Sequence, residues 1–185
     1  ISGMTQFGTK KLLDGSRGAN GVATGEGLQF VEALPETTTS PIQGFGVKID
    51  QVATKSSFQG ETALTQEIID AEETITISEN GKTVSYTTVK GDSVDANLNE
   101  LSRQIDRAGM DVELVRNEDN VVRIQHKEFG SDESFTVASS TAGVLSKTAN
   151  VSEEAIRGKD VKGTINGEET TGSGQILTGK LGTTV

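Results

Sequence analysis

Cysteine is absent from this chain of 185 residues, and histidine occurs only once, at His126. A chain without cysteine forms no disulfide, zinc–thiolate or iron–sulfur site, and a single histidine argues against a histidine-based zinc site or a histidine–carboxylate relay. No run of about 18 apolar residues occurs, so the sequence predicts no membrane-spanning helix. We therefore expect no cofactor, no metal ion and no membrane partner.

Basic residues are also few, because 17 lysines and arginines stand against 27 aspartates and glutamates, for a net charge of −10. This balance argues against a nucleic-acid partner or an anionic membrane surface. Aromatic residues make up 4% of the chain and proline occurs twice, whereas glycine occurs 22 times. The composition predicts a modest aliphatic core, many tight turns and one domain, with or without a small appendage.

The Asn80-Gly81 pair gives the clearest local signal. It separates two segments of alternating polarity, and Asn-Gly favours the two-residue type I′ turn because both central residues need positive φ. Such a turn pairs Ile77 with Val84 and Ile75 with Tyr86, so that all four apolar side chains lie on one face. The pattern predicts an antiparallel hairpin with one buried face.

A helix is predicted after this hairpin. Asp92 or Ser93 can cap its start, and Gly109 suits the left-handed position just beyond its end. The apolar stripe that predicts the helix consists of Val94, Leu98, Leu101, Ile105 and Ala108.

Shorter segments complete the expected elements. A second hairpin should pair Leu114 with Val122 and Val112 with Ile124, across a turn at residues 117–120. Residues 61–71 permit one short helix, with a strand as the competing interpretation. Further strands are predicted at residues 28–31, 46–54, 135–137 and 161–165. Together these elements predict an α+β fold of mainly antiparallel β hairpins, with one or two helices packed on the sheet and a turn-rich β segment before it.

None of the chemically reactive patterns predicts catalysis. Paired acids can act in glycosidases only in a cleft that separates their pKa values, and the pairs here lie in polar, turn-like contexts. We expect those pairs, at residues 72–73, 92 and 95, 153–154 and 168–169, to be solvated or to cap backbone. Residues 117–120 lack the spacing of a calcium loop, and His126 is expected to be an incidental surface residue. The sequence predicts no catalytic residue and no enzyme activity.

The segment that begins at Met4 resembles bacterial flagellins just after their N-terminal coiled-coil helices. Flagellins have there a small β region with a pattern like TQFN-G-KLLDG, and Gly8-Thr9 stands here where many flagellins have Asn-Gly. The residues that carry this resemblance are Gln6, Phe7, Leu12, Leu13, Asp14 and Gly15.

A second resemblance lies near the other end of the chain. Residues 160–168 and 172–177 look like the flagellin hook IN motif, which is named for its Ile-Asn pair. The matching residues here are Ile165, Asn166 and Gly167. The motif recurs in central, surface-exposed domains of flagellins and of hook-associated proteins such as the filament cap.

The resemblance implies a secreted, structural component of the bacterial flagellar filament that supports motility. Flagellin subunits polymerise through long terminal helices, and this chain shows no sustained apolar heptads. We interpret it as a fragment without those helices, with residues 1–40 near the filament core and residues 41–185 as the outer domain that contains the hook IN motif. Its partners would be other flagellin subunits through the missing helices, and the fragment itself should be monomeric. The alternative is a hook-associated or filament-cap protein domain with a binding or adhesion role.

Overall fold

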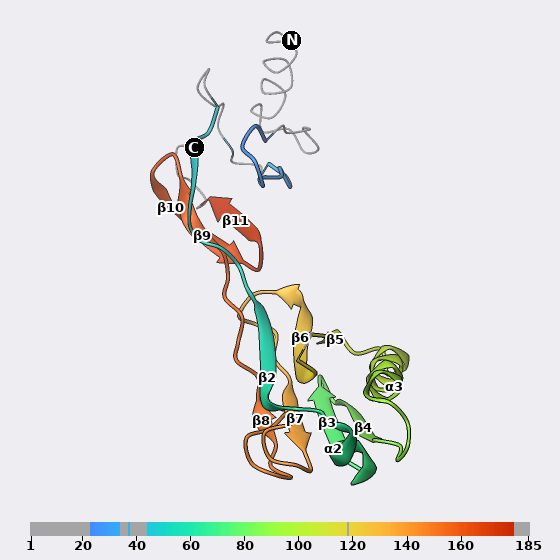
Figure 1. The fold of residues 1–185 in the computed structure, drawn as a ribbon. Coiled ribbons are helices and arrows are strands. Elements are labelled where there is room, and N and C mark those ends of the chain that lie inside the picture. Colours follow the sequence, from blue (N-terminus) through green and yellow to red (C-terminus); the bar gives the residue numbers. More distant parts are fainter. Residues whose placement is uncertain (1–22, 34–36, 38–43, 118, 180–185) are drawn as a thin grey trace. The chain divides into compact units, whose positions relative to one another are not determined.

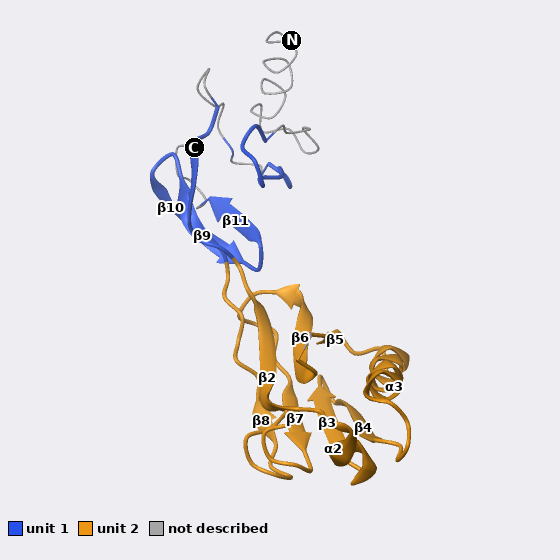
Figure 2. Ribbon diagram, viewed as in Figure 1, with its two compact units in different colours: residues 1–52, 161–185 blue, residues 53–160 orange. Residues whose placement is uncertain are grey.

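The computed structural model describes residues 23–33, 37, 44–117 and 119–179 (Figure 1). The chain divides into two compact units (Figure 2). Unit 1 comprises residues 1–52 and 161–185, and unit 2 comprises residues 53–160. Unit 2 is therefore inserted between two halves of unit 1. The expected boundary between residues 40 and 41 lies outside the described residues and stays a prediction.

The described residues of unit 1 form an antiparallel sheet of four strands in the order β1-β9-β10-β11. Its strands are β1 (Val47–Gln51), β9 (Lys162–Ile165), β10 (Glu168–Ser173) and β11 (Ile176–Gly179). The strands expected at residues 46–54 and 161–165 are thus confirmed. The strand expected at residues 28–31 is wrong, because this segment is irregular and Val31 is 63% exposed.

The first sheet of unit 2 has three antiparallel strands in the order β2-β6-β5. They are β2 (Lys55–Ala63), β6 (Val121–Phe129) and β5 (Val112–Val115). The expected register of the β5–β6 hairpin is wrong by two residues, since Leu114 pairs with Ile124 and Val112 with His126. Asn117 accepts a hydrogen bond from the Val121 N–H inside the turn. A shift of two preserves which face each side chain occupies.

The second sheet of unit 2 has four antiparallel strands in the order β4-β3-β7-β8. They are β4 (Lys82–Thr87), β3 (Thr74–Glu79), β7 (Thr136–Ser139) and β8 (Glu153–Glu154). The expected register is confirmed, because Ile77 pairs with Val84 and Ile75 with Tyr86, and all four side chains are buried. β7 confirms the strand expected at residues 135–137, although it begins one residue later.

Two helices accompany the sheets of unit 2. α3 (Val94–Arg107) is capped by the Ser93 hydroxyl, which accepts the Ala96 N–H, and Gly109 follows it with φ 62°, as predicted. α2 (Gln66–Asp70) is a single turn capped by Thr65. Both interpretations of residues 61–71 therefore hold in part. The first residues of the segment belong to the end of β2, and residues 66–70 form the short helix α2. In the described residues, no helix is long or apolar enough to cross a bilayer.

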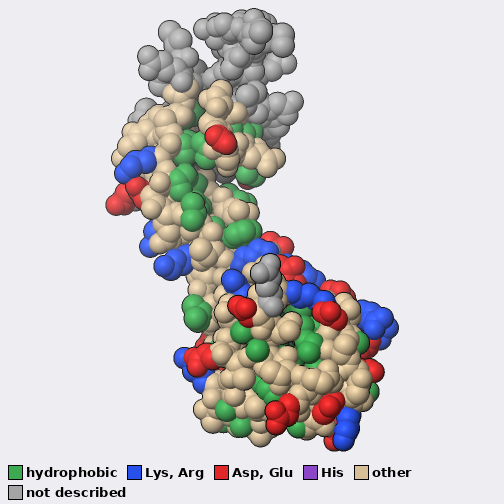
Figure 3. Space-filling model, viewed as in Figure 1, with side chains coloured by type: hydrophobic (Ala, Val, Ile, Leu, Met, Phe, Trp, Pro, Cys, Tyr) green, Lys and Arg blue, Asp and Glu red, His purple; other side chains and the backbone are tan. Residues whose placement is uncertain are grey.

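The apolar core of unit 2 lies between its sheets and α3. Leu101, Ile105 and Ile124 are at most 1% exposed. Acidic and basic side chains are interspersed over the visible surface of this unit (Figure 3). Antiparallel sheets with short helices agree with the predicted α+β fold class.

Candidate functional site

The residues of the Ile-Asn-Gly motif form the turn between β9 and β10. Ile165 ends β9, and Asn166 and Gly167 have φ values of 52° and 82°, as a type I′ turn requires. The Asn166 side-chain oxygen accepts the Gly46 N–H at 2.8 Å, and the Asn166 N–H donates to the Gly46 carbonyl at 2.8 Å. Asn166 therefore connects this turn to the backbone that leads into β1.

These two hydrogen bonds extend the pairing of β1 with β9. Val47 lies opposite Ile165 and Lys48 opposite Thr164, so Gly46 and Asn166 continue the same antiparallel ladder by one step. The chain leaves unit 1 after β1 and re-enters it before β9. The outgoing and returning segments of unit 1 are consequently paired with each other.

Close approach of the strands in this sheet depends on glycine. A Cβ atom at Gly163 would overlap the Lys48 carbonyl oxygen, and one at Gly172 would overlap the Val161 carbonyl oxygen. Both carbonyls are backbone atoms and cannot rotate away as a flexible side chain would. The two glycines therefore permit a spacing that no other residue would allow.

Unit 2 has a corresponding pair of segments at its own ends. The Thr54 N–H donates to the Lys159 carbonyl at 2.8 Å, and the Lys159 N–H reaches the Thr54 hydroxyl at 2.9 Å. Two further hydrogen bonds, of 2.9 and 3.0 Å, link Ser57 with Ile156. The chain thus enters and leaves unit 2 through neighbouring, paired segments, as a unit inserted into another fold requires.

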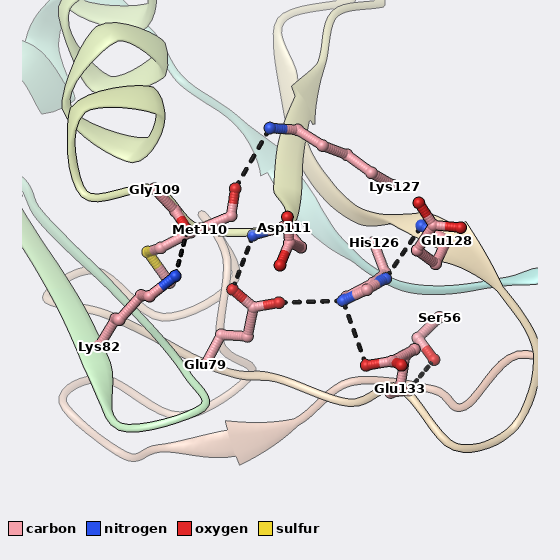
Figure 4. A network of polar contacts seen from close by, with 10 residues as sticks. All are labelled: Ser56, Glu79, Lys82, Gly109, Met110, Asp111, His126, Lys127, Glu128 and Glu133. Atoms are coloured by element: carbon pink, nitrogen blue, oxygen red, sulfur yellow. Dashed lines mark hydrogen bonds and ion pairs between the residues drawn. The ribbon is translucent and has the colours of Figure 1, made fainter.

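A network of polar contacts surrounds His126 on β6 (Figure 4). Its Nε2 atom lies 2.9 Å from Glu79 Oε1 and 3.5 Å from Glu133 Oε2, and its Nδ1 atom accepts the Glu128 N–H at 3.0 Å. The His126 side chain is only 1% exposed. The expectation of an incidental surface residue is therefore wrong.

The hydrogen bonds of His126 determine which nitrogen carries the proton. Because Nδ1 accepts a backbone N–H, the proton of the neutral ring is on Nε2 and is donated to Glu79. The second oxygen of Glu79 accepts the Asp111 N–H at 2.8 Å. Glu79, at the end of β3, thereby joins its own sheet to β6 of the other sheet and to Asp111, the residue just before β5. We interpret this cluster as a structural link.

The cluster offers no access for a substrate, since Glu79 and His126 are each 1% exposed. A surface groove of about 560 Å³ lies elsewhere in unit 2, and Tyr86, Asn99, Glu100 and Arg103 are among its lining residues. Burial raises the pKa of Tyr86, whose hydroxyl donates to Asn97 at 2.7 Å. Among the described residues, no group of histidine, aspartate and glutamate could hold a metal ion.

The acid pairs differ from the expectation at Glu73 and at Glu168, whose Oε2 atom is buried without a hydrogen-bond partner among the described residues. Asp92 and Asp95 are exposed, as predicted. Glu73, however, is 1% exposed, and its Oε1 atom accepts the N–H groups of Ser140 and Thr141 at 2.8 and 3.2 Å. It fixes the backbone after β7 and is buried, not solvated.

Other carboxylates bind backbone or basic groups near the surface. Glu153 accepts the N–H groups of Lys147 and Thr148, which is the capping role expected for it. Hydrogen bonds from Arg157, then from Ser134, lower the pKa of Glu154.

Three of the nine residues that carry the family resemblance are described. Ile165, Asn166 and Gly167 lie together at the β9–β10 turn. The other six, namely Gln6, Phe7, Leu12, Leu13, Asp14 and Gly15, lie outside the described residues. Their role stays a prediction.

No known family and no curated protein matches the sequence. Solved structures with a similar fold include the flagellar cap protein FliD D2-D3 domains of Serratia marcescens, with 15% identity, a TM-score of 0.46 and coverage of 71% of this chain and 77% of that chain. The FliD D1-D2-D3 domains of Escherichia coli have 12% identity and a TM-score of 0.42, over 71% of this chain and 42% of that chain. FliD (HAP2) of Pseudomonas aeruginosa has 18% identity and a TM-score of 0.42, over 71% and 66%. With identities and TM-scores this low, the comparison indicates only an approximate similarity of fold.

Proposed function

We propose that this chain is the surface-exposed part of a structural protein of the bacterial flagellum. The observation that carries the proposal is the pairing of the outgoing and returning strands of unit 1, fastened by Asn166 at the Ile-Asn-Gly turn. A protein built to display a folded unit outside a polymer needs both of its connecting segments on one side. The sequence resemblance to flagellin around Gln6 and Asn166 supports the same role.

In this proposal, unit 2 is the displayed body and unit 1 connects it to the assembly. Association occurs through terminal helices outside this sequence, with other subunits of the filament as partners. The net charge of −10 favours the role, since outer bodies of like charge repel one another and resist lateral association on a crowded polymer. The protein then acts outside the cell, and the isolated chain is a monomer.

Two kinds of flagellar protein fit these features. The main proposal is the outer domain of a flagellin, of which many copies line the filament. The alternative is a hook-associated or filament-cap protein with a binding or adhesion role, and the solved structures of similar fold are cap-protein domains. A cap protein occupies only the tip of a filament, so position along the filament separates the two.

Immunogold electron microscopy tests both possibilities. Antibodies against residues 53–160 are applied to intact, flagellated cells that make the protein, with a strain lacking its gene as the control. Gold along the whole filament supports the flagellin proposal, and gold only at filament tips supports the cap alternative. Gold absent from flagella, while the protein is detected elsewhere in the same cells, overturns the flagellar role altogether.

A further inference from the structure

The part of the chain that the structure describes contains two exposed hairpin tips with the same Asn-Gly sequence. Asn80-Gly81 joins β3 to β4, and Asn166-Gly167 joins β9 to β10. Both residues of each pair have positive φ, with 46° and 78° at the first tip and 52° and 82° at the second. The two tips therefore match in residue type, turn conformation and exposure.

The side-chain amides of the two asparagines differ in their hydrogen bonding. The Asn166 side chain accepts the Gly46 N–H at 2.8 Å, and its backbone N–H is bound to the same residue. Within the part of the chain that the structure describes, the side-chain amide of Asn80 has no hydrogen-bond partner. The Asn80 side chain can rotate without breaking a hydrogen bond, whereas the Asn166 side chain must first break its hydrogen bond with the Gly46 N–H.

We propose that Asn80 is a site of spontaneous deamidation and that the bond to Gly46 protects Asn166. The Gly81 nitrogen attacks Cγ of Asn80, so that a new N–Cγ bond closes a five-membered imide. The Cγ–Nδ2 bond breaks, and Nδ2 leaves as ammonia with the proton that the Gly81 nitrogen loses. Water then adds to either imide carbonyl and breaks its bond to nitrogen, which gives aspartate or isoaspartate. The missing Cβ of glycine leaves the attacking nitrogen unhindered.

Ring closure requires the asparagine side chain and the following peptide plane to rotate out of the turn conformation. If the reaction required the two strands of a hairpin to separate, Asn166 would react faster. The reason is that β9 and β10 share two paired positions, whereas β3 and β4 share six. If rotation at the tip is sufficient, Asn80 reacts faster, because only the Asn166 side chain must first release its hydrogen bond to Gly46. We infer that the local rotation decides, since it disturbs the fewest contacts.

The reaction changes the β3–β4 tip in two ways. Either product replaces a neutral amide by a carboxylate and adds one negative charge to the chain. Isoaspartate also inserts a methylene group into the backbone of a two-residue turn, whose geometry has no place for an extra atom. The turn is flanked by Glu79, which holds His126 and Asp111, so deamidation also loosens one end of the buried link.

The test follows both sites in one sample of the complete chain. The protein is incubated in mildly alkaline buffer, and peptide mapping by mass spectrometry measures the conversion of each asparagine to its acid over time. We expect Asn80 to react about fivefold faster than Asn166, the factor by which one ordinary hydrogen bond shifts a local opening equilibrium. In concentrated denaturant the two rates should converge, because the sites then differ only in sequence context.

A variant isolates the protecting bond. Gly46→Pro removes the N–H that Asn166 accepts and leaves the Gly46 carbonyl in place. It should raise the rate at Asn166 and leave the rate at Asn80 unchanged. Equal rates in the folded wild-type protein, or faster reaction at Asn166, overturn the proposal. So does a rate difference that is equally large in denaturant, because sequence context and not the fold then accounts for it.

Discussion

Unit 1 and unit 2 differ sharply in how much apolar surface they bury. In unit 2, two sheets and α3 enclose one cluster in which Leu101 and Ile124 are fully buried. In the described part of unit 1, Val161 is the only apolar side chain classed as buried, and Val47 and Ile49 are 40% and 37% exposed. The described sheet of unit 1 therefore depends on its backbone ladder and on the Asn166 bonds more than on packing.

This difference explains how one unit can be inserted into the other. A unit with its own core and with paired entry and exit segments retains its stability when its ends are attached elsewhere. The stability of a sheet with little apolar packing depends instead on its hydrogen bonds. The effects of substitutions in the two units should consequently differ in magnitude and in mechanism.

The largest difference is expected from deletion of apolar side chains. Ile124→Ala should lower the free energy of unfolding of unit 2 by about 2–5 kcal/mol, because it leaves a cavity in a closed core. Ile49→Ala in unit 1 should cost less than about 1 kcal/mol, since its side chain is already partly in water. Chemical denaturation followed by Tyr86 fluorescence reports on unit 2, because Tyr86 is the only tyrosine and tryptophan is absent. The unfolding of unit 1 is followed by amide exchange in β1. Equal losses for the two variants would contradict the contrast.

Substitution of a crowded glycine in unit 2 and of an uncrowded glycine in unit 1 should also differ in effect, although Gly163 and Gly172 of unit 1 are themselves crowded. A Cβ at Gly60 would overlap the backbone carbonyl oxygens of Val144 and Gly143, so Gly60→Ala should destabilise unit 2 by about 3 kcal/mol. Gly46→Ala is the matched variant in unit 1, where the nearest atom, Asn166 Oδ1, is 3.8 Å away. It should be nearly neutral. Thermal melting of both variants decides the matter, and a stable Gly60→Ala protein would refute the close packing.

Removal of the buried carboxylate tests the link between the sheets of unit 2. Glu79→Ala leaves the Asp111 N–H without its acceptor and the His126 Nε2–H with only the longer 3.5 Å contact to Glu133, and we expect a loss of about 2 kcal/mol. Glu61→Ala removes an exposed carboxylate from the same unit and should have little effect. Urea denaturation at neutral pH measures both. If both substitutions lower the free energy of unfolding equally, the hydrogen bonds of Glu79 contribute nothing to stability beyond the effect of removing one negative charge.

Local sequence patterns predict much of unit 2, including the inward orientation of two polar side chains. Asn80-Gly81 determined a hairpin register, and Ser93 with Gly109 marked the ends of α3. The same alternation places Glu79 on the face of Ile75 and Ile77, and it places His126 on the face of Ile124. Strand alternation therefore indicated that both polar residues point inward, although residue type alone suggested the surface.

Pairing between distant segments could not be predicted from such rules. The ladders of β2 with β6, of β3 with β7 and of β1 with β9 join segments far apart in the chain, and nothing in a single strand specifies its neighbour. The division of the chain into an inserted and an interrupted unit follows from those ladders. The role of Asn166 was hidden for the same reason, because its partner Gly46 lies 120 residues away.

The two Asn-Gly tips allow the bond to Gly46 to be measured by itself. Asn166→Gly and Asn80→Gly both keep a residue that adopts positive φ, but only the first loses a hydrogen bond. Asn166→Gly should cost unit 1 about 1 kcal/mol more than Asn80→Gly costs unit 2. Exchange of the Gly46 amide proton, observed by NMR, should accelerate in the first variant alone. Unchanged exchange would show that the bond is not maintained in solution.

The smallest expected effect is a pH dependence within unit 2. The hydrogen bond from Gln125, followed by that from Lys55, lowers the pKa of Glu113 below the ordinary value of a glutamate. A carboxyl whose pKa is lower in the folded state adds stability above the pKa of the unfolded chain and loses it as the pH falls through the folded value. Acidification should therefore lower the melting temperature of the wild type more than that of Glu113→Gln. Since the Glu113 side chain is 43% exposed, solvent screening keeps this difference small, and added salt should reduce it further. A difference that grew with salt would indicate another cause, since screening weakens an exposed ion pair and cannot strengthen it.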